Sequence, residues 1–189
     1  DNCDNTLNAT FVDGTAAGSC AGETIITRTW TLTDDCGNST VKVQTITIRD
    51  NTAPSFTDPS DITIYKDNNC NYDASVGVTG DVTDEADNCD NTLNATFADV
   101  AVPGSCVGET ILTRTWTLTD DCGNSTVKVQ IITIRDITPP TFTDPADITI
   151  YKDNSCNHDA SVGVTGDVTD EADNCDNTLD AIFSDVTVP

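Results

Sequence analysis

The chain has 189 residues and a formal net charge of −24, because 32 acidic residues stand against eight basic ones. This charge excludes a nucleic-acid-binding protein, which needs Lys and Arg to neutralise phosphates, and it predicts repulsion from anionic membrane surfaces. No apolar run reaches the roughly 18–20 residues that a membrane span needs, so we expect no direct membrane insertion.

One sequence unit recurs along the chain. Residues 1–103 align with residues 87–189 at a constant offset of 86, without insertions, and about five in six positions are identical. Self-similarity at a fixed period is typical of a tandem array. A polar, Pro-containing segment recurs at 49–54 and 135–140 and marks the borders between units. We therefore expect a segment of a longer array, with the C-terminal part of one repeat at 1–50, a complete repeat at 51–136 and the N-terminal part of the next at 137–189.

Within the complete repeat, apolar and polar residues alternate, as in half-buried antiparallel strands. In chain order the alternating runs are 62–66, 74–79, 93–97, 112–119 and 127–134. In the last run the apolar positions shift from Val127 and Val129 to Ile132 and Ile134, which predicts a β-bulge near Gln130–Ile131. No stretch has a convincing helical period. The sequence therefore predicts an all-β chain of tandem immunoglobulin-like β-sandwich domains, about seven strands each, with an 86-residue period.

Four cysteines occur in each full period, and in a small acidic β domain they predict two disulfides and an oxidising compartment. Three connectivities are possible. Because alternate turns of a sandwich lie at opposite ends, we expect one bond at each end of the domain. The predicted pairs are Cys70–Cys106, Cys89–Cys122 and, in the preceding repeat, Cys3–Cys36. A zinc site is disfavoured, because the cysteines are 16 to 19 residues apart and the lone His158 occupies the position of Tyr72 in the complete repeat.

Carboxylates gather at the turns and at the linkers, and Asp outnumbers Glu sevenfold. Asp suits both turns and oxygen-ligand cages, and Ca²⁺ takes six to eight oxygens. If Cys89 is bonded to Cys122, the acidic segments 81–90 and 120–124 lie side by side, at the end that faces the incoming linker. Carboxylates at such spacing repel unless a cation or protons intervene. The predicted ligands of a calcium site at the domain junction are Asp58, Asp61, Asp84, Glu85, Asp87, Asp90, Asp120, Asp121, Asn124 and Asp136. The alternative is that these residues cap turns and keep the surface soluble.

Other signals are weaker. Asn94 and Asn124 begin N-x-S/T sequences and are candidate glycosylation sites. A row of alternate threonines, 113–117, suits a sugar or an ice surface, although such a row is more often a simple exposed strand face. Acidic pairs can serve a hydrolase, but here they lie in loops of a repeated domain. Without a recurring His or a phosphate-binding Gly loop, we predict no enzyme activity.

Three motifs carry a family resemblance. They are Phe56-Thr57-Asp58-Pro59-Ser60-Asp61-Ile62-Thr63-Ile64, Trp116-Thr117-Leu118-Thr119-Asp120-Asp121-Cys122-Gly123-Asn124 and Ile134-Arg135-Asp136-Ile137-Thr138-Pro139-Pro140. The chain thereby resembles HYR-like (hyalin-repeat-type) immunoglobulin-like domains of very large secreted surface proteins of Bacteroidota. The resemblance covers parts of three repeats and implies non-enzymatic roles in adhesion, stalks or matrix, often with bound calcium.

These observations favour a structural segment of an extracellular bacterial filament or adhesin stalk, secreted or at the cell surface. We expect it to be locked by disulfides and stiffened by Ca²⁺, since near-identical repeats keep the rise and rotation per domain uniform. The expected partners are neighbouring copies of itself along a fibre, with glycans as a second class and no nucleic acid. The alternative is a tandem carbohydrate- or ice-binding module of a surface adhesin.

Overall fold

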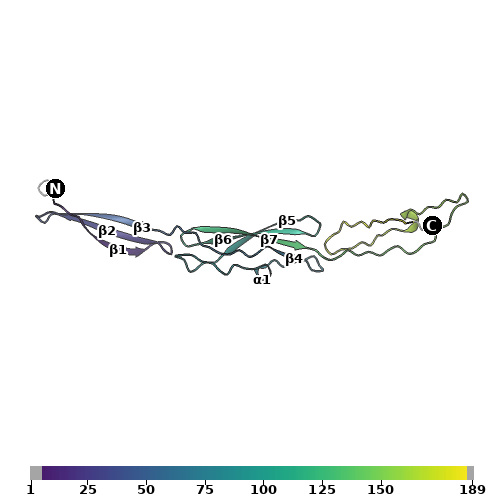
Figure 1. The fold of residues 1–189 in the computed structure, drawn as a ribbon, viewed down its shortest axis with the longest axis horizontal. Coiled ribbons are helices and arrows are strands. Elements are labelled where there is room, and N and C mark those ends of the chain that lie inside the picture. The colour runs from purple at the N-terminus through teal and green to yellow at the C-terminus, as the bar shows by residue number, and fades with distance from the viewer. Residues whose placement is uncertain (1–5, 187–189) are drawn as a thin grey trace. The chain divides into compact units, whose positions relative to one another are not determined.

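The computed structural model describes residues 6–186, and these form a nearly all-β structure (Figure 1). The strands are β1 (Thr10–Ala17), β2 (Thr24–Thr33), β3 (Ser39–Ile48), β4 (Ile62–Tyr65), β5 (Thr96–Pro103), β6 (Thr110–Thr119) and β7 (Ser125–Arg135); the one-turn helices are α1 (Val76–Thr79) and α2 (Val162–Thr165). The predicted all-β, immunoglobulin-like fold class is confirmed. Among the described residues, neither helix is long or apolar enough to cross a membrane.

The seven strands of the described residues form two sheets. The first has the order β1-β2-β3 and is antiparallel, with Trp30 of β2 opposite both Phe11 and Lys42. The second has the order β4-β7-β6-β5, and β4 runs parallel to β7, with Ile64 opposite Ile134. Strands β1–β3 and β5–β7 occupy the same sequence positions one 86-residue period apart. The repeat in the sequence is therefore also a repeat of structure.

The chain packs as two compact units that differ from the predicted repeats. The first unit comprises residues 1–60, 80–99 and 114–130, and the second comprises 61–79, 100–113 and 131–189. Each unit therefore combines parts of successive repeats, and each is described by itself below. The repeat borders at 50/51 and 136/137 remain predictions from the sequence.

The first unit buries apolar side chains and also the charged side chain of Arg114. The apolar members are Phe56, Val82, Trp116 and Leu118. The guanidinium of Arg114, which is 1% exposed, forms a two-bond ion pair with Asp99 at 2.8 Å and lies 4.2 Å from the ring centre of Phe97. Phe97 in turn packs against Trp116, with ring centres 5.1 Å apart. A buried charge is tolerated only with such partners, so Arg114 is a strand residue with a packing role.

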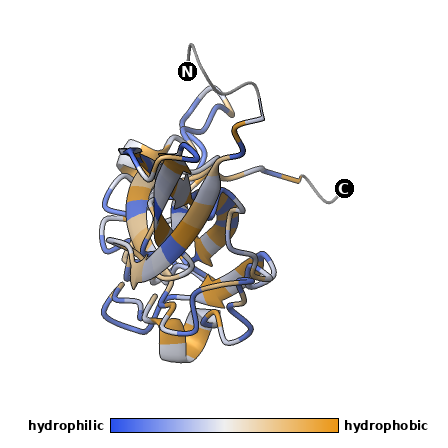
Figure 2. Cartoon of the chain, turned by 90° about the vertical axis from the view of Figure 1, so that its left-hand side faces the viewer, coloured by the Kyte–Doolittle hydropathy of each residue, from blue (hydrophilic) through white to orange (hydrophobic). Residues whose placement is uncertain are grey.

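The core of the second unit is aliphatic. Ile64, Leu112, Ile132 and Ile134 form a buried cluster, and Ile62 and Ala74 pack against its edge. All of these except Ala74 lie on β4, β6 or β7. The alternation of orange and blue bands along the strand ribbons in Figure 2 is the pattern that puts such side chains on one face of a sheet.

The predicted β-bulge in the last strand is wrong. Along β7 the inward positions are the even-numbered residues throughout, so Val127 and Val129 face solvent while Ile132 and Ile134 are buried. The inward position between these pairs is Gln130, which is fully buried. Its amide donates to the carbonyl of Ser60 at 3.0 Å, and its oxygen accepts from the indole of Trp116. Because the inward residue at position 130 is polar and hydrogen-bonded, the apolar–polar alternation of the sequence wrongly indicated a change of phase in a regular strand.

The predicted strand at 74–79 is also corrected. The segment turns into α1, where the amides of Val78 and Thr79 donate to the carbonyl of Ser75. Asp73 accepts from the amide of Ser75 at 2.9 Å, and Gly80 follows with a φ of +96°. The Asx-type turn at Asp73 and the positive φ of Gly80 favour a helical turn here, although the alternation of Val and Gly predicted a strand.

Candidate functional site

Two disulfides join cysteines that are more than one repeat period apart. In the first unit Cys20 is bonded to Cys122, with Cα atoms 5.1 Å apart and a sequence separation of 102. In the second unit Cys70 is bonded to Cys175, with Cα atoms 5.2 Å apart and a separation of 105. Each bond therefore ties one repeat to the next.

The predicted pairs Cys70–Cys106 and Cys89–Cys122 are wrong, because Cys70 and Cys122 are bonded elsewhere. The prediction assumed that each sandwich closes its own bonds, whereas successive repeats share one compact unit. Of the third predicted pair, Cys3 lies outside the described residues and Cys36 is an exposed free thiol. The other free cysteines of the described chain are Cys89, Cys106 and Cys156.

Cys89 lies against Gly22 in the first unit, and this contact requires glycine. Gly22 has a φ of +80°, and a Cβ there would come within 2.6 Å of the Cys89 Cβ and 2.7 Å of its Sγ. In the second unit the equivalent contact joins Gly108 to Cys175, at 3.2 Å. Burial and the neighbouring carboxylates of Asp50 and Asp87 raise the pKa of the Cys89 thiol, so it stays protonated at neutral pH.

Three carboxylates converge beside the Cys20–Cys122 bond, in the same first unit. One oxygen from each of Asp50, Asp87 and Asp120 lies within 4.8 Å of the other two. Asp120 is buried, and the other two are half-buried. Among the ion pairs of the described residues, none includes any of the three. The cluster therefore concentrates negative charge that no ion pair of the described residues offsets, and a bound cation relieves such repulsion.

Local turns fix two of these carboxylates. Asp120 opens the turn after β6, where it accepts from the backbone amide of Asn124 at 2.8 Å and from its side-chain amide at 2.7 Å. Asp50, at the start of the linker, accepts from the amide of Thr52 at 3.0 Å, and this bond holds the pKa of Asp50 below its usual value. Both side chains are thereby held in place as acceptors before any ligand arrives.

Asp87 supplies the atom that fits a metal best. Its Oδ2 accepts from the amide of Cys89 at 2.7 Å and from that of Asp90 at 3.1 Å. Its Oδ1 is buried and has no hydrogen-bond partner. A buried carboxylate oxygen without a donor is costly unless an ion uses it. The donor set, three carboxylates with oxygens close together, matches the preference of Ca²⁺ for oxygen ligands.

The structure thus brings together two of the predicted ligands, Asp87 and Asp120. The third member, Asp50, was not in the predicted set. The sequence signal was present, because Asp50 is the counterpart of the predicted ligand Asp136 one period earlier. The prediction placed the site at the end that faces the incoming linker, but it named Asp136, from the linker that leaves the complete repeat, whereas the cluster uses Asp50 of the linker that enters it. In the second unit Asp136 accepts from the amide of Asn174, whose own Oδ1 is buried and unpartnered.

The remaining predicted ligands lie outside the cluster. Asp121 is exposed, and its backbone amide donates to the buried Asp90. Asn124 donates its side-chain amide to Asp120 and to the carbonyl of Asp50. The others accept from backbone amides or a lysine: Asp58 from Lys128, Asp61 from Ile131, Asp84 from Thr57 and Glu85 from Ala95.

The candidate glycosylation sites differ in accessibility. Asn94 is exposed, just before β5. Asn124 uses its side-chain nitrogen in the two hydrogen bonds that organise the turn beside the carboxylate cluster. Glycosylation at Asn124 would replace one of the two hydrogens of this nitrogen and so break at least one of the bonds, which makes Asn94 the more accessible acceptor.

Glu109 forms a brace in the second unit that the sequence did not reveal. Its side chain is buried and accepts from the amide and hydroxyl of Ser105 at 2.6 and 2.7 Å, and from Arg135 at 2.8 Å. These bonds, Ser105 first, lower the pKa of Glu109 from 4.5 to about 2. Glu23 makes the same contacts with Ser19 and Arg49 in the preceding repeat. The recurrence of S-C-x-G-E in both repeats was the available signal.

A comparison of the chain with known protein families tests the resemblance found in the sequence. Residues 1–48 match the family model described as an HYR-like domain with 4 cysteines. The predicted HYR-like resemblance is confirmed. Because residues 87–134 repeat residues 1–48 at the 86-residue offset, the same HYR-like pattern recurs in the chain. No curated protein matches the chain. The HYR-like match and the disulfides indicate an extracellular repeat module, and HYR-like domains of the immunoglobulin type are structural, non-catalytic modules.

Proposed function

We propose that this chain is a structural segment of an extracellular bacterial filament or adhesin stalk, in which disulfides and Ca²⁺ stiffen the joints between successive repeats. The observation that carries the proposal is the Cys20–Cys122 bond, which ties one repeat to the next beside a cluster of three carboxylates. A bond that crosses the joint restrains the orientation of the two repeats. A spacer needs that restraint, whereas a string of independent binding modules does not.

Calcium is proposed to sit at Asp50, Asp87 and Asp120. The convergence of their oxygens within 4.8 Å and the unpartnered Oδ1 of Asp87 support this assignment. The three residues come from the linker, from the segment after β4 and from the turn after β6. A cation held by all three would therefore tie the linker to the body of the repeat. Its stabilising effect should grow with free calcium concentration, as for any ligand that binds only the folded state.

The alternative of a carbohydrate- or ice-binding module has less support. It needs a flat, accessible platform shared by the repeats. The threonine row of β6, Thr113, Thr115 and Thr117, lies in the interior of its sheet and is only half-exposed. Such a row offers less contact area than an open strand face.

Calcium titration with melting tests the proposed function. Wild type should melt at a higher temperature in millimolar Ca²⁺ than in excess chelator, and calorimetry should detect saturable binding. The double variant Asp87→Asn, Asp120→Asn should lose both effects. Asp121→Asn is the matched control, because it removes a charge one residue from Asp120 but outside the cluster. Equal melting with and without calcium, or equal loss in the control, would contradict the calcium assignment.

A further inference from the structure

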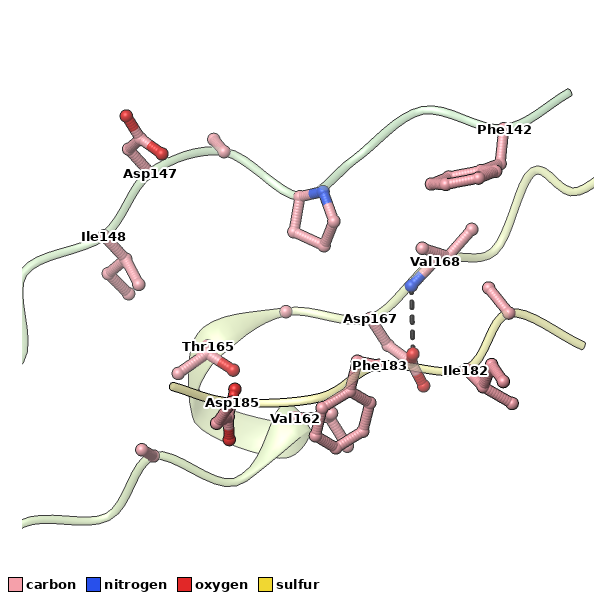
Figure 3. A pocket seen from close by; sticks show the side chains of 15 residues that line it. Phe142, Asp147, Ile148, Val162, Thr165, Asp167, Val168, Ile182, Phe183 and Asp185 are labelled. Carbon is pink, nitrogen blue, oxygen red and sulfur yellow. Dashed lines mark hydrogen bonds between the residues drawn. The ribbon is translucent and has the colours of Figure 1, made fainter. Parts of the chain in front are cut away.

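Some surfaces stay exposed in the complete repeat although all of its own residues are present. The apolar hollow within residues 142–185 (Figure 3) is not such a surface. Phe142, which lines the hollow, is 60% exposed, whereas its counterpart Phe56 in the complete repeat is 5% exposed. Strand β5 behaves differently, because all eight of its residues, Thr96–Pro103, are exposed within the complete repeat. The exposure of β5 is therefore a property of the repeat itself.

The joints between successive repeats leave β5 free. The residues that contact one another across the two joints are Cys20, Ala21, Gly22 and Asp50 with Asn88, Cys89, Cys122 and Asn124, and Asp67, Cys70, Gly108 and Asp136 with Asn174 and Cys175. Among the described residues, no hydrogen bond, ion pair or disulfide across a joint involves β5 or its counterpart β1. A further repeat that joins in the same way therefore leaves this strand exposed.

Strand β5 also has an edge without a partner. It is the outermost strand of the sheet β4-β7-β6-β5, and neither a strand nor an isolated bridge of the described residues pairs with its second side. On that side, an eight-residue strand presents backbone N–H and C=O groups to water. Such an edge is a template on which a further strand adds by main-chain hydrogen bonds.

The edge lacks the charges that usually prevent such pairing. Proteins commonly protect an edge with charged side chains, Lys above all. The single charged residue of β5 is Asp99, and its carboxylate is already paired with the guanidinium of Arg114 at 2.8 Å. Val100 and Val102 are 64% and 49% exposed. Because the whole chain carries a net charge of −24, an uncharged edge is where a second copy meets the least repulsion.

The sequence of this strand differs between repeats, but its charge does not. Strand β5 differs from β1 at five of eight positions, whereas β6 differs from β2 only where Leu112 replaces Ile26. None of these changes adds or removes a charged residue. Main-chain pairing tolerates changes among uncharged side chains, whereas recognition through side chains does not. The variation therefore favours a partner that binds the backbone of the strand.

We propose that β5 of one chain pairs with β5 of a second copy, antiparallel and about a two-fold axis, so that copies associate side by side. A two-fold axis makes a single surface complementary to itself. Residues directly opposite each other lie on the same face of the joined sheet, so the axis passes through a residue. With the axis at Val100, Asp99 of one copy stands opposite Ala101 of the other. An axis at Asp99 would oppose two carboxylates, which is destabilising.

Repetition strengthens a contact that is weak at one strand. Each cross-strand pair contributes roughly 0.2–1 kcal/mol. The counterpart strand β1 is likewise the outermost strand of its sheet. A chain that pairs at one edge holds its next edge at a high effective concentration, so a repeated stalk gains affinity with each repeat. The inference goes beyond the proposed stiffening of the joints, because it uses neither the disulfides nor the carboxylate cluster.

Hydrogen exchange of the full chain tests the proposal at β5 itself. At about 0.15 M salt, which screens the charge, the amides of residues 96–103 should exchange more slowly as protein concentration rises, in parallel with dimers or larger oligomers in sedimentation. Val100→Lys should raise the concentration needed for this protection at least about tenfold, because two lysines would stand opposite each other at the axis.

Val127→Lys is the matched control. Val127 is 58% exposed, close to the 64% of Val100, but it lies on β7, between β4 and β6. Both variants lower the net negative charge equally, so a general relief of repulsion would favour association in both. The control should change the concentration needed for β5 protection less than about twofold. Equal weakening in the two variants, or no concentration-dependent protection of residues 96–103, would overturn the proposal.

Photo-crosslinking supplies the register. Val100 is replaced by benzoylphenylalanine, and equal amounts of ¹⁴N- and ¹⁵N-labelled chain are mixed and irradiated. Crosslinks should join position 100 of one isotope to residues 98–102 of the other. Crosslinks to another segment, or within one isotope only, would overturn the pairing of β5 with β5. Calcium-dependent melting of a chain that stays monomeric would leave the proposed function standing, and β5 protection without any calcium effect would leave only this inference standing.

Discussion

Cys122 is bonded to Cys20, a residue of the preceding repeat, although Cys36, Cys89 and Cys106 are all closer to it in sequence. The bond closes a loop with a sequence separation of 102. In the chain-entropy model, a loop of that size stabilises the folded state by about 4–5 kcal/mol. The joint between successive repeats is therefore a covalent part of the structure.

The variant Cys20→Ser should lose most of that stabilisation. We expect a fall in the free energy of unfolding of about 3–5 kcal/mol, measured by denaturant titration. Cys106→Ser is the matched control, because Cys106 is the counterpart of Cys20 and is a free thiol. A large loss in Cys106→Ser would support the pairing of Cys106 with Cys70 and contradict the structure.

Gly22 provides a test of the packing at the same joint. Gly22→Ala adds a methyl group that meets Cys89 at 2.6 Å and also strains a φ of +80°. Gly37→Ala strains a φ of +86° but meets nothing within 4 Å. The strain alone costs about 1–2 kcal/mol. Gly22→Ala should therefore destabilise the chain more than Gly37→Ala, and the difference in unfolding free energy measures the contact. Equal losses would show that Cys89 does not pack there.

Much of the fold followed from the pattern of the sequence, because strand alternation is a local property. Strands β6 and β7 were predicted from their alternating residues, and the 86-residue offset predicted their counterparts β2 and β3. The cysteine pairing was missed for a different reason. Each cysteine has an equivalent in the neighbouring repeat, so spacing does not reveal which repeat supplies its partner.

Only two of the three carboxylates of the site were predicted, again because a repeated sequence does not reveal which repeat supplies a residue. Asp87 and Asp120 lie on turns of one repeat, and their closeness followed from the expected sandwich. Asp50 belongs to the incoming linker, and its identity depends on which linker folds back on the turns. Gln130 shows the opposite error: a polar residue at an inward position concealed a regular strand, because its hydrogen bonds to Ser60 and Trp116 are long-range.

Arg114 should be more important for stability than its counterpart Arg28. Both pair with an aspartate across a sheet at 2.8 Å, but the Arg114 side chain is 2% exposed and that of Arg28 is 26% exposed. Asp99→Ala should leave the buried guanidinium without its main partner and cost about 2–3 kcal/mol, reduced from the range for fully buried pairs because Asp99 is partly exposed. Asp13→Ala, the matched control, should cost under about 1 kcal/mol. Similar unfolding free energies for the two variants would refute the packing role of Arg114.

Glu109 should make the stability of the chain depend on pH in acid. Its bonds to Ser105 and Arg135 lower its pKa from 4.5 to about 2. Because the folded-state pKa is the lower one, the contribution of Glu109 is fully present above pH 4.5, where the carboxylate is charged in both states. As the pH falls from 4.5 towards 2, the unfolded chain takes up the proton first, so this contribution is lost. Glu109→Gln should therefore flatten the fall in unfolding free energy between these two pH values, measured by denaturant titration at several pH values. Glu85→Gln, which removes a carboxylate that pairs with no basic residue in the described part of the chain, should leave the slope close to that of wild type, and an equal flattening in both variants would contradict the brace.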